Sequence, residues 1–167
     1  DLIGKLPKKN EQIRIITQKS FNAFALLLLI IQKYKISELY LAIYRIDKNS
    51  VEGLKNLILD GQIKQATIVI SSFFRSSKKA ETWHNNLVEF AQKTKNIKVV
   101  YCWNHAKILA VKTVCKQYFV IEGSGNLSDN ARIEQYLFEN RKETFEFHRD
   151  WINDLYATST THEYTEI

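Results

Sequence analysis

The sequence predicts an α/β protein in which a mixed β-sheet is covered by helices. Segments with helical periodicity alternate with strand-like runs, an order typical of one sheet with helices packed on its faces. Hydrophobic residues make up 45% of the 167 residues and are spread evenly, which argues against disorder. We therefore expect a single domain over residues 1–167, with a core over about 18–156 between a polar N-terminal lead-in and a C-terminal tail.

The predicted helices have apolar residues at helical spacing. The first contains the longest apolar run, Ala23–Ile31, which is about half as long as a membrane span and predicts a buried helix. The second is expected to begin at a cap formed by Asn49 or Ser50 and to end at Gly61. The tail from Ala157 is expected to fray. Helices are expected over residues 18–34, 50–61, 77–93 and 142–156.

The predicted strands are rich in β-branched and aromatic residues. A continuous apolar run at 66–74 is typical of a strand that is buried on both faces. Segments 105–112 and 117–123 alternate with a period near two, and the polar "KTVCKQ" between them predicts a hairpin turn. Strands are expected over residues 38–46, 66–74, 97–103, 105–112, 117–123 and 133–138.

The composition limits the partners and cofactors to expect. A net charge of +6 and a pI near 9.2 suit a polyanionic partner such as nucleic acid, although many basic domains bind none. Cys102 and Cys115 are too few for a disulfide framework or a zinc site. Both lie in apolar runs, so we expect core thiols and a reducing, cytoplasmic location. No metal or other cofactor is expected.

Polar residues stand at the matched ends of the predicted hairpin. His105 and Lys107 are two apart at the start of one strand, so their side chains are expected on the same face. In an antiparallel pair the end of the second strand lies beside that start, so Ser124 and Asn126 are expected to converge on them. This set offers a nucleophile or base, a positive charge and neutral hydrogen-bond donors, which suits the binding and attack of an anion. The structural alternative is a strand-end histidine beside an ordinary turn.

The pattern "HAK…EGSGN…IEQ" resembles the histidine-lysine signature of the phospholipase D superfamily, followed by its Gly-Ser-x-Asn and a later acidic residue. The predicted order of elements over about 18–156 is also similar to that of a single-copy member. The resemblance implies a phospholipase D-like fold and a phosphodiesterase. Because small single-copy members are typically nucleases that work as homodimers, it implies an endonuclease acting on nucleic acid as a homodimer. No cluster of acidic or Cys/His ligands accompanies His105, so we expect metal-independent chemistry, and without a membrane anchor we expect no stable membrane association. We expect DNA rather than RNA as the partner, although the sequence does not decide between them.

The resemblance also implies a role for each matched residue. His105 would be the nucleophile that forms a phosphohistidine, and His105 of the partner subunit would act as general acid and then as base. Lys107 and Asn126 would hold the non-bridging oxygens, with Ser124 beside them. Glu134 would hydrogen-bond the second nitrogen of His105 and fix its tautomer.

The sequence departs from the family pattern near these residues. Lys112 stands where the family has an aspartate, a change that concerns local packing more than chemistry. The hairpin is a few residues longer before Gly123, which raises the question of whether the Ser-Asn pair is displaced. Glu134 comes sooner than the pattern implies, and Glu139 and, more remotely, Glu122 are the alternatives for its role.

Residues around the motif are candidates for substrate binding. Trp103 and Asn104 directly precede it and are expected to line the entrance of the site, with core packing as the alternative for the tryptophan. Arg75 and Lys78 follow the second strand and are candidates for contacts with a phosphate backbone, with solvated surface charge as the alternative. His148 is expected to pack against the core.

Two rival functions remain beside the endonuclease. A non-catalytic nucleic-acid-binding module of the same fold would not need the complete His-Lys-Ser-Asn set that the sequence contains. A phospholipid hydrolase or transferase would be expected to have a membrane anchor or an interfacial helix, and the sequence shows neither signal.

Overall fold

The structure confirms the predicted α/β class, with a mixed sheet and helices on both of its faces. The computed structural model describes residues 5–18, 21–74, 81–129 and 133–161. The strands are β1 (Gln12–Thr17), β2 (Ile36–Ile43), β3 (Ala66–Ser71), β4 (Ile97–Cys102), β5 (Lys107–Thr113), β6 (Tyr118–Gly123) and β7 (Glu134–Asn140). The helices are α1 (Phe24–Ile31), α2 (Lys48–Leu59), α3 (Glu81–Lys93) and α4 (Lys142–Thr161), with a 3₁₀ turn η1 (Ser72–Phe74) directly after β3.

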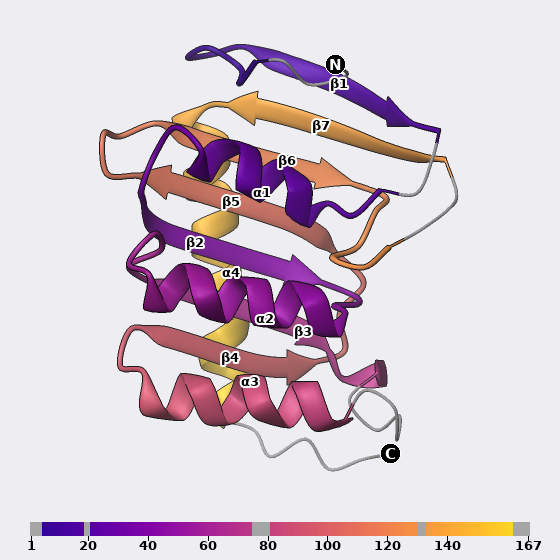
Figure 1. Ribbon diagram of the computed structural model, residues 1–167, viewed down its shortest axis with the longest axis vertical. Coiled ribbons are helices and arrows are strands. Elements are labelled where there is room, and N and C mark those ends of the chain that lie inside the picture. The colour runs from indigo at the N-terminus through magenta and orange to yellow at the C-terminus, as the bar shows by residue number, and fades with distance from the viewer. Residues whose placement is uncertain (1–4, 19–20, 75–80, 130–132, 162–167) are drawn as a thin grey trace.

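The order of the strands brings several strand ends to one edge of the sheet. Among the described residues, seven strands lie in the order β1-β7-β6-β5-β2-β3-β4 (Figure 1). The β2–β3 and β3–β4 pairs are parallel and the other pairs are antiparallel. As a consequence, β2, β3, β4 and β6 end at the edge where β5 and β7 begin. We call this the site edge, and it lies on the right in Figure 1.

Helices cover the sheet unequally. Figure 1 shows α1, α2 and α3 on one face, whereas α4 crosses the other face alone. The buried strands alternate between the two layers, so that Leu41 belongs to the cluster under the three helices and Ala42 to the cluster under α4. Helix α4 contributes the fully buried Phe145 and Ile152 to that second cluster. Both faces of the central strands are therefore apolar, which explains their continuous hydrophobic runs.

The chain joins the sheet earlier than the sequence predicted. We expected the core to begin at about residue 18, but β1 precedes that point and pairs with β7 along its whole length. The alternating segment "QIRIIT" is short and stands within a polar lead-in, so its strand signal is weak. The first helix is shorter than the expected 18–34. It begins at Phe24, where the Asn22 side chain accepts the backbone N–H at 2.9 Å and turns the chain.

The cap of α2 is not the residue we predicted. Asp47 precedes the helix, and its Oδ1 accepts the Ser50 N–H at 2.8 Å, so neither Asn49 nor Ser50 is the cap. The carboxylate also suits the positive end of the helix dipole. Gly61 ends the helical segment as predicted, in the left-handed region with φ of 67°.

Two expectations about the surface are wrong. Helix α4 continues past Ala157, where fraying was expected, and its Ser159 is only 8% exposed. Cys102 is buried at the end of β4 as predicted, but Cys115 is exposed. Cys115 lies in the turn between β5 and β6, where Lys116 adopts a φ of 62° and the chain leaves the sheet.

Lys112, which stands where the phospholipase D pattern has an aspartate, forms an ion pair with a carboxylate on the neighbouring strand. Lys112 of β5 pairs directly with Glu38 of β2, and its Nζ lies 2.5 Å from Glu38 Oε1. This hydrogen bond to Glu38 raises the pKa of the Lys112 ammonium above its ordinary value. A lysine at this position therefore contributes to the pairing of β2 with β5.

Reversing the charge of Lys112 should weaken this strand pair. Lys112→Ala is expected to lower the free energy of unfolding by roughly 0.2–1 kcal/mol, the range for partly exposed ion pairs. Lys112→Asp should lower it further, because two carboxylates would then face each other across the strands. The double variant Lys112→Asp with Glu38→Lys should recover most of the loss in urea denaturation. If Lys112→Asp were as stable as the wild type, the ion pair would contribute nothing to the β2–β5 pairing.

Candidate active site

The site edge contains the polar residues that the sequence singled out. Lys107 opens β5 and His105 lies two residues before it, Ser124 and Asn126 lie in the loop after β6, and Glu134 opens β7. The β5–β6 hairpin is antiparallel as predicted, with Ile108 opposite Glu122 and Lys112 opposite Tyr118. The turn of the hairpin, residues 114–117, is at the opposite edge of the sheet from these residues.

A loop of four residues, 103–106, joins β4 to β5 and contains His105, and Asn104 holds it in place. The Asn104 Nδ2 donates to the backbone carbonyl of Ile43 at 3.2 Å, and its Oδ1 accepts the Ala106 N–H at 2.8 Å. The first bond ties the loop to the end of β2, and the second closes a turn within the loop around His105. His105 itself is exposed. Asn104, predicted as a substrate-binding residue, thus positions the backbone on either side of the histidine.

Lys107 lies beside the His105 ring, as the two-residue spacing predicts. Its Nζ is 2.9 Å from the His105 carbonyl oxygen and 3.4 Å from His105 Nδ1. Burial lowers the pKa of the Lys107 ammonium below its ordinary value, and the negative charge of Glu134 opposes that shift. Because an ammonium only donates, this contact with Nδ1 is a hydrogen bond only in the tautomer whose ring proton is on Nε2.

The loop after β6 is fastened to β7 through Ser124. The Ser124 N–H donates to the Gln135 carbonyl at 3.0 Å, and the Gln135 N–H donates to Ser124 Oγ at 3.0 Å. The Ser124 hydroxyl in turn donates to the carboxylate of Glu134. The next residue, Gly125, packs so closely that a Cβ there would lie 1.8 Å from Tyr136 Oη. Glycine is thus required at this position by close approach.

Tyr136 is the buried floor of this loop. It is 3% exposed, and burial, with a smaller contribution from the charge of Glu134, raises the pKa of its hydroxyl to about 12. Lys107, Gly125 and Tyr136 line the same small hollow. The Lys107 side chain and the Gly-Ser-Gly-Asn loop therefore line one hollow, at the edge of the sheet where the sequence predicts that they converge.

Asn126 connects that loop to the chain after β2. Its Oδ1 accepts the backbone N–H of Arg45 at 3.0 Å, and its carbonyl accepts the Ala23 N–H at 3.4 Å. The last residue of β2, Ile43, lies opposite Lys107 in the sheet. Asn126 and Lys107 are thus both held against the end of β2, and the longer hairpin has not carried Asn126 away from the site edge.

Glu134 is placed differently from the expectation for it. We predicted a hydrogen bond to His105, but in the described part of the chain none joins the two residues, and Glu134 instead accepts from Ser124. The alternatives lie elsewhere. Glu122 is 2.5 Å from Nε2 of the buried His148 on the α4 side of the sheet, which also confirms that His148 packs against the core. Glu139 is near the other end of β7.

This protein is similar to known proteins in its structure but not in its sequence. No model of a known protein family and no curated protein matches the sequence. The polyphosphate kinase of Porphyromonas gingivalis superposes on 94% of this chain with a TM-score of 0.61 and 15% identity. The phosphatidylserine synthase of Haemophilus influenzae Rd KW20 superposes on 90% with a TM-score of 0.53 and 12% identity. Both have the fold of the phospholipase D superfamily. The chain has a phospholipase D-like fold.

The likeness concerns only part of these larger proteins. This chain spans 27% of the length of the kinase and 39% of the length of the synthase. Within its phospholipase D-like fold, His105 lies just before the central strand β5 and Lys107 opens that strand, while the Gly-Ser-Gly-Asn loop begins at the end of the neighbouring strand β6.

An aromatic hollow adjoins the histidine in this phospholipase D-like fold. It measures about 190 Å³ and is lined by Tyr44, Ser71, Phe73, Trp103, Asn104 and His105. Trp103 is 79% exposed, so core packing does not explain it, and it lines the same hollow as His105. Tyr44 and Phe73 were not among the residues predicted from the sequence, although both come near the ends of predicted strands. Arg75 and Lys78 lie outside the described residues.

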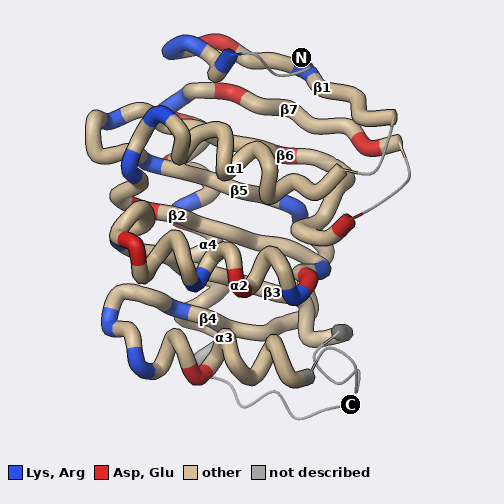
Figure 2. Tube along the Cα trace, viewed as in Figure 1, with Lys and Arg blue, Asp and Glu red and all other residues tan. Residues whose placement is uncertain are grey.

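Other features of the surface are less specific. Figure 2 shows Lys and Arg at both edges of the sheet, so the positively charged residues that the structure describes are not concentrated at the site edge. In the described ranges, no group of three or more His, Cys, Asp or Glu side chains could hold a metal ion. The same ranges contain no helix with the length and apolar character needed to cross a bilayer.

Proposed function

We propose that this protein is a phosphodiesterase that hydrolyses nucleic-acid phosphodiester bonds through a phosphohistidine on His105. The observation on which the proposal depends is the exposed His105 ring with the Lys107 ammonium 3.4 Å from its Nδ1, at the edge where the Gly-Ser-Gly-Asn loop also lies. The phospholipase D-like fold supports it, since both structural neighbours are named for phosphate-containing compounds, polyphosphate and phosphatidylserine. The basic pI favours a polyanionic substrate, for which we propose DNA rather than RNA.

The reaction has two displacements at phosphorus. In the first, the lone pair of His105 Nε2 forms a P–N bond while the P–O bond to the leaving group breaks, and that oxygen takes a proton from a general acid. In the second, water forms a P–O bond while the P–N bond breaks, and the conjugate base takes the water proton. The products are an alcohol and a phosphomonoester, and His105 is restored. Attack requires the ring proton on Nδ1, so Lys107 must leave Nδ1 as the substrate binds.

The phosphate itself supplies the reason for Lys107 to move. A phosphodiester has a negative charge that repels nucleophiles, and an ammonium placed on its non-bridging oxygens offsets that repulsion. Asn126 accepts from Arg45 through Oδ1, which orients its Nδ2 group as the donor toward the same oxygens. Ser124 and Glu134 are positioning residues in this scheme, because they hold the loop that contains Asn126.

The general acid is proposed to come from a second copy of the chain. His84 and His148, the other histidines in the described ranges, are 1% and 4% exposed and lie on α3 and α4, so neither faces the site edge. A twofold axis through the site would place His105 of the partner subunit on the opposite side of the phosphate. We therefore propose a homodimer with one composite site, with no metal ion in the chemistry.

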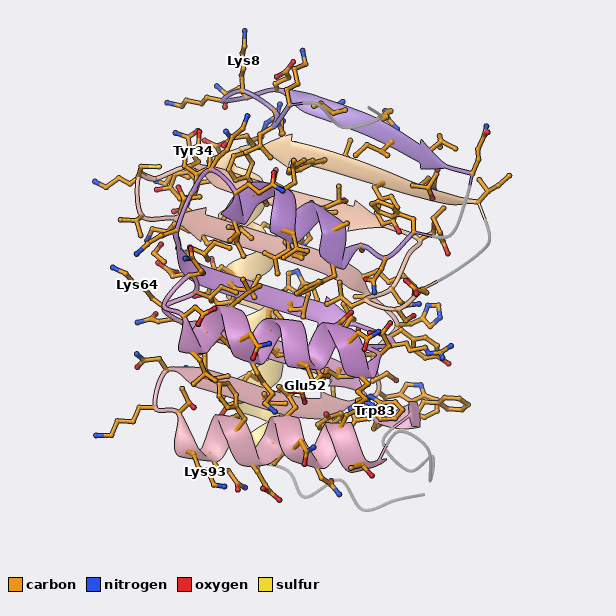
Figure 3. The ribbon with its side chains drawn as sticks, viewed as in Figure 1. Lys8, Tyr34, Glu52, Lys64, Trp83 and Lys93 are labelled. Atoms are coloured by element: carbon orange, nitrogen blue, oxygen red, sulfur yellow. The ribbon has the colours of Figure 1, made fainter. Side chains whose placement is uncertain are left out.

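Replacing His105 tests the proposed chemistry. In buffer containing EDTA, the wild-type protein is expected to cleave plasmid or single-stranded DNA. His105→Ala should lower the rate by at least about 10²–10⁴-fold, the usual contribution of acid-base catalysis alone. Lys107→Ala should also lose activity. Lys64→Ala is the matched control, because Lys64 is exposed at the opposite edge of the sheet (Figure 3).

Three results would contradict this function. Near wild-type cleavage by His105→Ala would leave a nucleic-acid-binding module as the better explanation. A strict need for added magnesium or zinc would contradict the metal-independent mechanism. Cleavage of a phosphatidylcholine dispersion, with DNA and RNA left intact, would replace the nuclease with a phospholipid hydrolase. Circular dichroism of each variant shows whether the fold is retained.

Mixing subunits tests the composite site. Wild type and His105→Ala are unfolded together, refolded at varied ratios and assayed at constant total protein. If both histidines act on one phosphate, activity should fall as the square of the wild-type fraction. A linear dependence would indicate an independent site in each subunit and would contradict the shared site. A fully active monomer in light scattering would contradict it as well.

A further inference from the structure

Two large aromatic side chains are exposed together beside His105. Trp103 is 79% exposed and Phe73 is 55% exposed, and their ring centroids are 6.3 Å apart in an edge-on arrangement. Single exposed hydrophobic residues are ordinary, but a contiguous aromatic pair at the edge of a proposed active site indicates a binding surface. Trp103 directly follows β4 and Phe73 lies in η1 directly after β3, so the parallel strands bring them together.

A third ring, that of Tyr44, lies between Phe73 and the proposed nucleophile His105. Tyr44 stacks near Phe73 with a centroid distance of 6.1 Å, and it approaches the His105 ring at 4.4 Å. Phe73, Trp103 and Tyr44 together form what we call the aromatic wall. A group that lies against this wall is therefore one ring away from the atom that would attack phosphorus.

The hollow beside the wall is large enough for more than water. Its volume of about 190 Å³ compares with about 30 Å³ for one water molecule in the liquid. Two of its polar groups already have partners, since the Asn104 amide holds the backbone and the Ser71 hydroxyl oxygen accepts the Phe73 N–H at 3.4 Å. The hollow thus offers aromatic faces for stacking more than groups that could hydrogen-bond to the edge of a nucleobase. If it binds nucleic acid, it should therefore have little preference for nucleotide sequence.

The positive charge at the wall helps to select the occupant. Lys107 Nζ lies 5.3 Å from the centroid of the Tyr44 ring, which is the position that a ligand cation would take over that face. A quaternary ammonium headgroup would therefore be repelled there. A neutral nucleobase attached to an anionic phosphate has the opposite preference, because its ring can stack while its phosphate approaches Lys107.

We propose that the aromatic wall stacks an unpaired nucleobase next to the scissile phosphate, so that the substrate is single-stranded nucleic acid. In a duplex both faces of each base are covered by its neighbours, and a base must leave the stack before an aromatic side chain can cover it. A single strand meets that requirement at little cost. This inference rests on the proposed phosphodiesterase function and names its substrate class.

Oligonucleotide cleavage by wall variants tests the inference. The wild type should cleave a single-stranded DNA oligonucleotide at least about tenfold faster than the same strand annealed to its complement. Trp103→Ala should lower kcat/KM on the single strand by about 5- to 150-fold, the range expected for loss of one base-aromatic stack. Trp103→Phe should recover most of that loss. Phe147→Ala, which removes a 66% exposed aromatic ring from α4 on the other face, is the matched control and should leave cleavage unchanged.

An abasic nucleotide beside the cleaved bond supplies the second half of the test. If the missing base is the one that stacks, the wild type should lose about the same factor on the abasic strand as Trp103→Ala loses on the complete strand, and combining the two changes should add little. Equal cleavage of single strand and duplex, or undiminished kcat/KM for Trp103→Ala, would overturn the inference. A Trp103→Ala defect confined to phosphatidylcholine would overturn it in favour of a lipid headgroup.

A substrate without a base separates failure of this inference from failure of the proposed function. Methyl p-nitrophenyl phosphate reports on His105 chemistry alone. If the wild type cleaves it in a His105-dependent manner while the wall variants cleave DNA normally, only the stacking inference is wrong. If the wild type cleaves neither this ester nor any oligonucleotide, the phosphodiesterase function itself is wrong.

Discussion

The register between β5 and β6 is the constraint on which the candidate site depends. With Ile108 opposite Glu122, the start of β5 and the end of β6 meet at the site edge. A slip of one residue would exchange the faces of the hairpin and separate Glu122 from His148 on the α4 side. Two clamps outside the ladder hold the adjoining loop in the same register, namely the Ser124 bonds to β7 and the Asn126 bond to the end of β2.

Lys107 connects the two halves of the proposed site. It contacts the His105 ring on one side and lies over the Tyr44 ring on the other. Its contacts are with the His105 ring and carbonyl and the Tyr44 ring, and burial disfavours its charge more than Glu134 favours it. An arriving phosphate would relieve that penalty, so binding of the anion, release of His105 Nδ1 and occupation of the aromatic wall are consequences of one movement.

The sequence could predict the hairpin because period-two alternation and a polar turn are local signals, and the hairpin determines where His105 and Asn126 lie. It could not predict β1, whose short alternation stands in polar surroundings and becomes a strand only by pairing with β7. The sequence also could not predict that Glu134 accepts a hydrogen bond from Ser124, because sequence spacing does not say which neighbouring strand a carboxylate reaches. Tyr44 and Phe73 were missed because an aromatic residue at a strand end looks the same whether it enters the core or faces solvent.

The central claim is a covalent bond between phosphorus and His105, and trapping that bond tests it most directly. Wild-type protein is mixed with excess oligonucleotide, quenched in alkali, which preserves phosphohistidine, digested and examined by tandem mass spectrometry. The account predicts a nucleotidyl adduct on the peptide that contains His105, formed before the second product and absent from His105→Ala. Complete turnover without any adduct, or an adduct on another residue such as Ser124, would contradict it.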